Sequence, residues 1–327
     1  MADISTVYMG MNLRSPIIAG SSGLTNTLKN IREMENHGIG AVVLKSLFEE
    51  QIRHETRQTL AMQPPSAYPE AMDYIHHYTQ QHSLEAYLKL IRDAKASTSI
   101  PIIASINCVS SAEWTSFAAE IELAGADALE LNIFVLPSDP FRTGEENEKI
   151  YFDIINEIKK KVKIPVSIKL SWYFSSLAKT LTQLSWTGIS GMVLFNRFYS
   201  PDIDLDDMEV MSSHVFSQPG EMHMPLRWIA MLSDRLHCDI AGSTGVDNGE
   251  SAIKMLLAGA KAVQVASAFY KYGFTRISDI NQQISDWLDV KGYASVAEII
   301  GKMNIRNIEN PAAYERVQFM KHFAGIE

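Results

Sequence analysis

Several short hydrophobic segments of this chain end in polar residues that could bind a ligand. Amines, amides and hydroxyls follow five of these segments, at Lys45 with Ser46, Asn107, Asn132, Lys169 and Asn196. A single asparagine at such a place is as often a turn residue as a ligand. A lysine at the end of a buried strand is harder to explain, because buried lysines need a partner. We therefore interpret the five segment ends together as one binding site.

Two later segments end in small residues of the kind that surround a phosphate group. Gly242-Ser243-Thr244-Gly245 follows the seventh hydrophobic segment, and Ala266-Ser267 follows the eighth. Small residues let backbone N–H groups approach an anion, and the loops after the last two strands of a barrel commonly bind phosphate. A helix that begins near Asn248 or Ser267 would add its dipole. The sequence therefore predicts a site for an organic phosphate.

The hydrophobic segments alternate with amphipathic ones, which is typical of a parallel sheet wound with helices. Each segment is largely apolar on both faces, as a strand covered on both sides must be. Eight such strands predict a (β/α)8 TIM barrel, in which all the strand ends meet at one face. An open doubly wound sheet remains the alternative. The predicted strands are Pro16–Ala19, Ala41–Leu44, Ile102–Ile106, Ala128–Leu131, Val166–Lys169, Gly191–Phe195, Asp239–Ala241 and Ala262–Val265.

Helical periodicity marks Ser111–Ala124 and Ile150–Lys161 as two of the intervening helices. The phrase Ala-Gly-Ala occurs at 124–126 and again at 258–260, where the glycine is expected to end a helix in a left-handed conformation. The segment Val7–Leu13 alternates around a glycine and predicts a small hairpin that covers the barrel floor. From about Asp279 onward we expect helices packed outside the barrel.

Long connections are expected after three of the strands, and therefore on the C-terminal face of the barrel. They run from Leu47 to about Ser99, from Asn132 to Glu148 and from Asn196 to Pro225. The first connection contains His76, His77 and Tyr78 and could form a lid over the site.

The composition excludes several classes of protein. The 29 basic residues are outnumbered by 38 acidic ones and form no basic face, which argues against a nucleic-acid partner. There is no secretory h-region and no apolar run long enough to span a bilayer, so we expect a cytoplasmic protein without a membrane partner. Two cysteines, Cys108 and Cys238, do not make a disulfide framework, and no metal is expected. We expect a single domain over 1–327, with a small-molecule substrate as its partner, and leave a homodimer open.

The strand ends and the segments that carry them resemble the dihydroorotate dehydrogenases, a family of FMN-binding barrels, and in particular the bacterial dihydroorotate dehydrogenase-like group. The resemblance runs from about Tyr8 to Tyr270. It implies FMN as the cofactor and hydride transfer at flavin N5. The stretches that carry it are Pro16–Gly20, Ala41–Ser46, Glu130–Asn132, Pro165–Leu170, Asn196, Gly242–Val246 and Ala258–Ser267.

The resemblance also implies roles for individual residues. Ala19 would lie beside the flavin ring, and the amines and amides at the strand ends would contact the flavin or the substrate. The small residues after the last two strands would hold the FMN phosphate. The predicted cofactor-binding residues are Ala19, Gly20, Lys45, Ser46, Asn107, Asn132, Lys169, Asn196, Gly242, Ser243, Thr244, Gly245, Ala266 and Ser267.

The chain departs from the family where the catalytic base should be. The family has a Cys or Ser three residues after the asparagine of strand four, and this chain has Val135, which cannot accept a proton. Cys108 and Ser138 are the remaining candidates for a base, so the catalytic residue is unknown. Smaller departures are Thr244, where the family has glycine, and Ala266-Ser267, where it has Gly-Thr. Dihydroorotate oxidation is therefore in doubt, whereas FMN binding is expected.

Two other functions fit the same residues. The missing base is compatible with a non-catalytic FMN-binding protein. A strand-end lysine, Lys169 or Lys45, could instead form a Schiff base in an aldolase that acts on a phosphorylated sugar.

Overall fold

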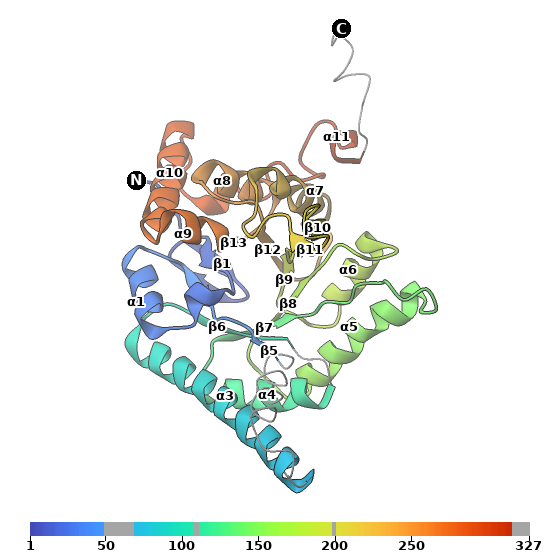
Figure 1. Cartoon of the computed structure of the whole chain (residues 1–327). Helices are drawn as coiled ribbons and strands as arrows, with labels where there is room; N and C mark the ends of the chain where they lie inside the picture. The colour runs from blue at the N-terminus through green and yellow to red at the C-terminus, as the bar shows by residue number, and fades with distance from the viewer. Residues whose placement is uncertain (49–68, 108–110, 198–200, 316–327) are drawn as a thin grey trace.

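The central element of the molecule is a closed barrel of eight parallel strands (Figure 1). The computed structural model describes residues 1–48, 69–107, 111–197 and 201–315. Strand β4 pairs with both β3 and β6, which closes the sheet and excludes the open alternative. The predicted (β/α)8 barrel is confirmed, and each strand agrees with its predicted limits within two residues. The barrel strands are β3 (Ile17–Ala19), β4 (Ala41–Val43), β6 (Ile102–Asn107), β7 (Ala128–Asn132), β8 (Val166–Leu170), β9 (Gly191–Leu194), β12 (Asp239–Ser243) and β13 (Ala262–Val265).

Helices surround the barrel and cover the outer faces of its strands (Figure 1). Gly125 and Gly259, each following a helix, have φ of 94° and 122°, which confirms the left-handed conformation predicted for both Ala-Gly-Ala phrases. The longest helix after β13 packs against α8 outside the barrel, as expected. The helices are α1 (Leu28–Asn36), α3 (Pro69–Ser97), α4 (Ser111–Leu123), α5 (Gly144–Lys159), α6 (Leu177–Ser185), α7 (His223–Leu232), α8 (Gly249–Ala258), α9 (Ser267–Tyr272), α10 (Thr275–Lys291) and α11 (Ala312–Glu315). Short 3-10 turns are η1 (Gly23–Thr25), η2 (Pro219–Met222) and η3 (Val296–Glu298). Among the described residues, no helix is long and apolar enough to cross a membrane.

A hairpin covers the barrel floor, as the sequence predicts. Strands β1 (Thr6–Tyr8) and β2 (Met11–Leu13) pair antiparallel around a turn at Met9 and Gly10, whose φ values of 53° and 78° suit a tight hairpin turn. Tyr8, Met9 and Leu13 are buried against the lower ends of the barrel strands. The Met9 N–H donates to Asp239 Oδ2 at 2.7 Å, which fastens the turn to the start of β12.

All three predicted long connections contain helical residues that we did not predict. The chain after β4 forms β5 (Leu47–Phe48), which pairs with β6, and then α3, and neither element was predicted within this long connection. Leu84, Leu88 and Ile91 are buried along one face of α3, and this i, i+4, i+7 spacing was the signal. Residues 49–68, and the side chains of His76, His77 and Tyr78 on α3, lie outside the described residues, so the lid stays untested.

Helix α5 begins six residues before the predicted Ile150. Thr143 is its N-cap, because the Thr143 hydroxyl accepts from the Glu146 N–H while the Glu146 carboxylate accepts from the Thr143 N–H. This capping box, a Thr-x-x-Glu pattern, was readable in the sequence. The connection after β7 therefore spans only residues 133–143.

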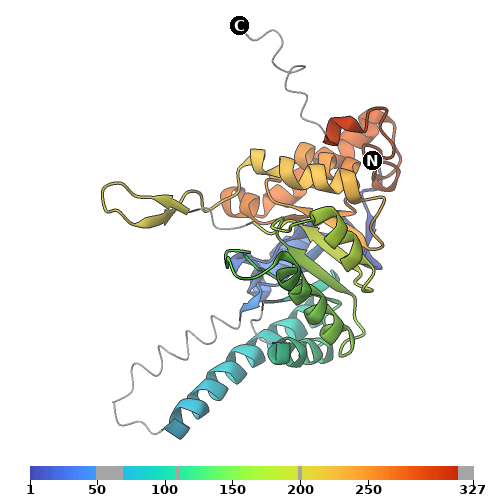
Figure 2. The same cartoon turned by 90° about the vertical axis from the view of Figure 1, so that its right-hand side faces the viewer.

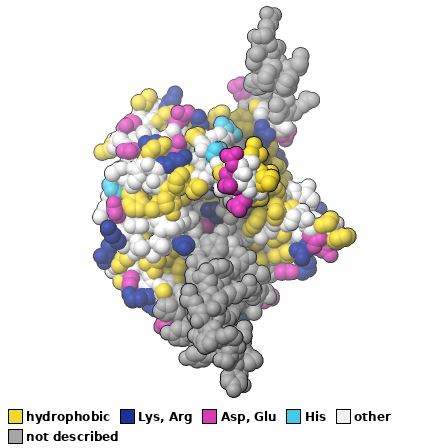
Figure 3. Space-filling view, viewed as in Figure 1, with side chains coloured by type: hydrophobic (Ala, Val, Ile, Leu, Met, Phe, Trp, Pro, Cys, Tyr) yellow, Lys and Arg dark blue, Asp and Glu magenta, His cyan; other side chains and the backbone are white. Residues whose placement is uncertain are grey.

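The third connection forms a hairpin that projects from the C-terminal face (Figure 2). Its strands are β10 (Pro201–Ile203) and β11 (Val210–Ser212), which the sequence analysis did not predict. Exposed apolar and acidic side chains lie together on it, at the magenta and yellow projection near the centre of Figure 3. A two-stranded hairpin without further packing has no hydrophobic face to bury, so its sequence carries no clear period.

Candidate functional site

Two adjoining cavities lie at the carboxyl ends of the barrel strands. The cradle cavity, of about 210 Å³, lies over β12 and β13, and the central cavity, of about 380 Å³, lies over β4 and β6–β9. Ser21, Lys169, Asn196 and Arg197 line both, so the two cavities share one wall. The barrel thus brings together residues that are more than two hundred positions apart in the chain.

Twelve of the fourteen predicted binding residues line these cavities, and two do not. The cradle cavity is lined by Gly20, Ser243, Thr244, Gly245, Ala266 and Ser267, together with Lys169 and Asn196. The central cavity is lined by Lys45, Ser46, Asn107 and Asn132, together with Lys169 and Asn196. Ala19 is buried within β3, and Gly242 faces the helix layer, where an added Cβ would lie 3.1 Å from Met255 Sδ.

The floor of the cradle cavity is a turn in an unusual backbone conformation. Thr244 and Gly245 have φ of 78° and 74°, so two successive residues are left-handed. Thr244 is a strained choice there, and its hydroxyl donates to the Phe195 carbonyl at 3.1 Å, which holds the turn. Helix α8 begins beyond this turn with Asn248 as its N-cap, and α9 begins at Ser267, as predicted. Small residues on the turn and at the start of α9 line this concave surface, and such a lining leaves room for an anion.

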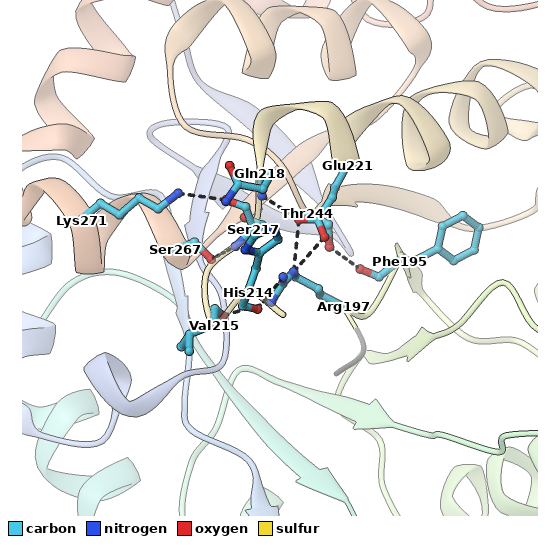
Figure 4. Close-up of polar contacts among 10 residues, drawn as sticks. All are labelled: Phe195, Arg197, His214, Val215, Ser217, Gln218, Glu221, Thr244, Ser267 and Lys271. Atoms are coloured by element: carbon cyan, nitrogen blue, oxygen red, sulfur yellow. Dashed lines mark hydrogen bonds and ion pairs between the residues drawn. The ribbon is translucent and has the colours of Figure 1, made fainter. Parts of the chain in front are cut away.

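Arg197 fastens a loop beside the cradle cavity (Figure 4). The strap, residues 214–218, contributes Val215 and Ser217 to the cavity wall. Arg197 Nη1 donates to the Val215 carbonyl at 3.0 Å, Nη2 donates to the His214 carbonyl at 2.8 Å, and Nε lies 3.1 Å from Glu221 Oε2. Sequence reasoning missed Arg197, although a cation directly after the strand-six asparagine was a usable signal.

Two further contacts attach the strap to α9, the helix that follows β13 (Figure 4). The Ser217 N–H donates to Ser267 Oγ at 3.1 Å, and Lys271 Nζ donates to the Ser217 carbonyl at 2.9 Å. The strap is therefore held from both sides of the cavity, by β9 through Arg197 and by α9 through Ser267 and Lys271.

Lys169 is almost completely buried yet reaches both cavities. Its Nζ donates to Gln264 Oε1 at 2.9 Å, and Gln264 Nε2 donates to Glu130 Oε2 at 2.5 Å. Burial lowers the pKa of Lys169 and the negative charge of Glu130 opposes this shift. Burial raises the pKa of Glu130, against the attraction of Lys169 and the Gln264 hydrogen bond. Neither Gln264 nor Glu130 was predicted as a site residue, because both lie inside hydrophobic strands.

The remaining polar residues of the central cavity are oriented by one another. Asn196 Nδ2 donates to Asn132 Oδ1 at 2.9 Å, which ties the ends of β9 and β7 together. On the opposite wall, Ser46 Oγ lies 3.0 Å from Ser21 Oγ and 2.7 Å from Ser105 Oγ. These contacts hold the polar groups in place before any ligand arrives.

The loop after β7 separates the central cavity from a third one. Phe134 lines the central cavity, whereas Val135 lines an outer cavity of about 390 Å³ between the loop, α5 and the chain after β8. The Val135 N–H donates to the Tyr151 hydroxyl at 3.2 Å, which fixes this arrangement. Ser138 is exposed and lines none of the three cavities, and Cys108 lies outside the described residues.

Fold and site together define a (β/α)8 barrel with a cationic, amide-rich site at the carboxyl ends of its strands. The dihydroorotate dehydrogenase family model matches residues 4–288. The chain therefore belongs to the dihydroorotate dehydrogenase family. This match confirms the resemblance to the dihydroorotate dehydrogenases that the sequence indicates.

Individual relatives align along nearly their whole length. The chain is 27% identical over 307 residues to the catalytic subunit of dihydroorotate dehydrogenase B (NAD(+)) from Thermoplasma volcanium, covering 92% of this chain and 98% of the relative. It is 29% identical over 297 residues to the protein of the same name from Pyrococcus abyssi, covering 89% and 96%. The corresponding protein from Methanosarcina acetivorans is 25% identical over 297 residues, covering 89% and 93%.

Proposed function

We propose that this protein binds FMN and is an oxidoreductase that transfers hydride at flavin N5. One observation carries the proposal: the left-handed turn at Thr244 and Gly245 and a buried ammonium group, Lys169, line the same pair of adjoining cavities. FMN carries a phosphate at one end and a ring that gains negative charge on reduction at the other. The membership of the dihydroorotate dehydrogenase family supports the same conclusion.

The chain's own residues divide the work of binding between the two cavities. The turn at Ser243–Gly245 and the hydroxyl of Ser267 would hold the phosphate, with the strap beside them. Bound FMN would supply the hydride acceptor. Lys169 would face the ring and stabilise negative charge on it. A unit charge at ~4 Å contributes on the order of 4 kcal/mol at an effective dielectric of ~20, before desolvation is subtracted.

The central cavity favours a small anionic substrate. Lys45, Lys169 and Arg197 line it, and its amides at Asn132 and Asn196 can orient a polar molecule. Its described lining residues include no carboxylate, imidazole or thiol. The position of the family's base, Val135, has no proton acceptor and lines the outer cavity instead, and we propose that dihydroorotate is not the substrate. A protein that binds FMN without turnover is the second candidate, and the same missing base favours it.

Identification of the small molecules released by heat from protein purified without added cofactor tests the proposal. Mass spectrometry should find FMN. Recovery of FAD, or of no flavin, would sink it. Photoreduction followed by a screen of oxidants and reductants then separates an enzyme from a non-catalytic binder. Trapping of a carbonyl substrate on Lys169 by borohydride would instead support the aldolase.

A further inference from the structure

A carboxylate lies inside the barrel beneath the site, where neither cavity reaches it. Glu130 is in the middle of β7 and only 1% of its surface is exposed. Its Oε2 accepts the bond from Gln264, and its Oε1 has no hydrogen-bond partner among the described residues. A buried acid with an unsatisfied oxygen is expensive, because desolvation penalises its charge. Such a group calls for a reason beyond packing.

The side-chain amide of Gln264 links this acid to Lys169, and the hydrogen bonds can form with only one orientation of the amide. A glutamine side chain has a donor end and an acceptor end. Glu130 takes the donor end at 2.5 Å, so the acceptor end faces Lys169 Nζ at 2.9 Å. The reversed amide would put NH₂ against an ammonium group and oxygen against a carboxylate. Glu130 therefore determines which atom of Gln264 the lysine meets.

The charges around the pair come from several elements. Tyr8 from the floor hairpin and Tyr87 from α3 lie near enough to interact electrostatically with Glu130, and burial raises the pKa of both phenols. Lys45 and Arg197 share the central cavity with Lys169. Glu130 thus supplies the negative charge that attracts the buried Lys169 ammonium group, which has Lys45 and Arg197 as cationic neighbours. Without it, Lys169 would lose its attraction to a counter-charge while remaining desolvated.

We propose that Glu130, acting through Gln264, is a positioning residue that keeps Lys169 charged and aimed at the cradle and central cavities, where FMN would bind. It thereby sets the reduction potential of the bound flavin and the pH range over which that potential is held. The effect on the flavin potential rests on the proposed function. The effect on the charge of Lys169 rests only on the contacts of Glu130, Gln264 and Lys169.

The first test measures the midpoint potential of bound FMN between pH 6 and 9 in Glu130→Gln. Removal of the negative charge should raise the potential slightly at pH 6, where Lys169 is still protonated. As the pH rises Lys169 should lose its proton, and the potential should fall below that of the parent. The expected loss at pH 9 is about tenfold in the preference for the reduced ring, or about 30 mV for two electrons. The two curves should therefore cross.

Matched variants separate this role from a general disturbance. Glu122→Gln makes the same change in an acid that accepts from the N–H groups of Lys163 and Ile164 below the barrel, and its curve should follow the parent. Gln264→Leu removes the hydrogen bonds that join Glu130 to Lys169, and it should reproduce the fall in midpoint potential at high pH. In a Lys169→Met background, Glu130→Gln should no longer change the slope. Parallel curves for Glu130→Gln and the parent would overturn the proposal.

A second test needs no flavin and so separates this inference from the proposed function. Trinitrophenylation of Lys169 by trinitrobenzenesulfonate at pH 8 is followed by peptide mass spectrometry in cofactor-free protein. Only the neutral amine reacts, so Glu130→Gln should accelerate labelling of Lys169 about tenfold, because loss of the Glu130 charge lowers the pKa of Lys169 further. Equal labelling rates would refute the role of Glu130, even if FMN binds. Should Glu130→Gln fail to fold, Gln264→Leu provides both readouts.

Discussion

Arg197 and Glu221 form an ion pair, with Nε 3.1 Å from Oε2, at the base of the strap that borders the cradle cavity. Glu221 also accepts from the Gln218 N–H at 2.7 Å, so the same carboxylate holds both the arginine and the end of the strap. The strap's position thus depends on these charge-assisted bonds together with the contact of Phe216 with Tyr270 of α9, whose ring centroids lie 5.5 Å apart.

Loosening this pair should speed the release of a ligand from the cradle cavity. Arg197→Met removes two hydrogen bonds to strap carbonyls as well as the ion pair. Each hydrogen bond to a charged group is worth about 1.5–3 kcal/mol, so FMN should dissociate at least about tenfold faster. Recovery of flavin fluorescence on dilution measures the rate. Arg227→Met, an exposed change on α7, is the matched control, and an equal rate in both variants would contradict the prediction.

Gly245 should tolerate no side chain. Its φ is 74°, and an added Cβ would lie 2.4 Å from the Met222 backbone nitrogen. Because both groups belong to the backbone, the turn at Gly245 and η2 could move apart only at a cost in free energy. Gly245→Ala should lower the free energy of unfolding by about 1–3 kcal/mol and weaken flavin binding. Gly220→Ala, where no atom lies within 4 Å of the added Cβ, should leave both quantities nearly unchanged. Urea denaturation and fluorescence titration check this, and similar losses in the two variants would refute it.

Dihydroorotate should be oxidised poorly or not at all. A positioned base contributes about 10²–10⁴-fold, and the position of the family's base is Val135, which has no proton acceptor and lines the outer cavity. Val135→Cys should not restore turnover, because this position lines the outer cavity, whereas Phe134→Cys places a thiol in the central one. Steady-state assays of the three proteins decide the matter. Ordinary turnover in the parent that Cys108→Ala or Ser138→Ala abolishes would show that the base has moved.

Glu130 should make the stability of the cofactor-free protein fall as the pH rises. Its folded-state pKa is raised above the ordinary value of 4.5, so the folded chain holds a proton that the unfolded chain releases. Stability from this group is full below about pH 4.5 and is lost as the pH rises through the folded pKa. Urea denaturation should therefore show the parent losing stability relative to Glu130→Gln as the pH rises above about 4.5. A constant difference across that range would mean that burial does not perturb this acid.

Local patterns were enough to predict the barrel and most of the site. Strands β3 to β13 of the barrel could be read from short apolar segments, since each is covered on both faces. The two Ala-Gly-Ala phrases marked helix ends, because left-handed backbone favours glycine. Lys45, Asn132, Lys169 and Asn196 were predictable as neighbours, because parallel strands of a closed barrel place all their carboxyl ends on one face.

Other features depend on which side chains meet across the barrel, and these only the tertiary structure decided. Glu130 and Gln264 are 134 positions apart, and each alone is a polar residue in an apolar strand. Whether Val135 or Phe134 faces the central cavity depends on the path of one loop, held by Tyr151. Short-range periodicity determines which segments become strands and where they end. The contacts of a buried charge are determined by closure of the sheet, which brings together residues with no local relationship in sequence.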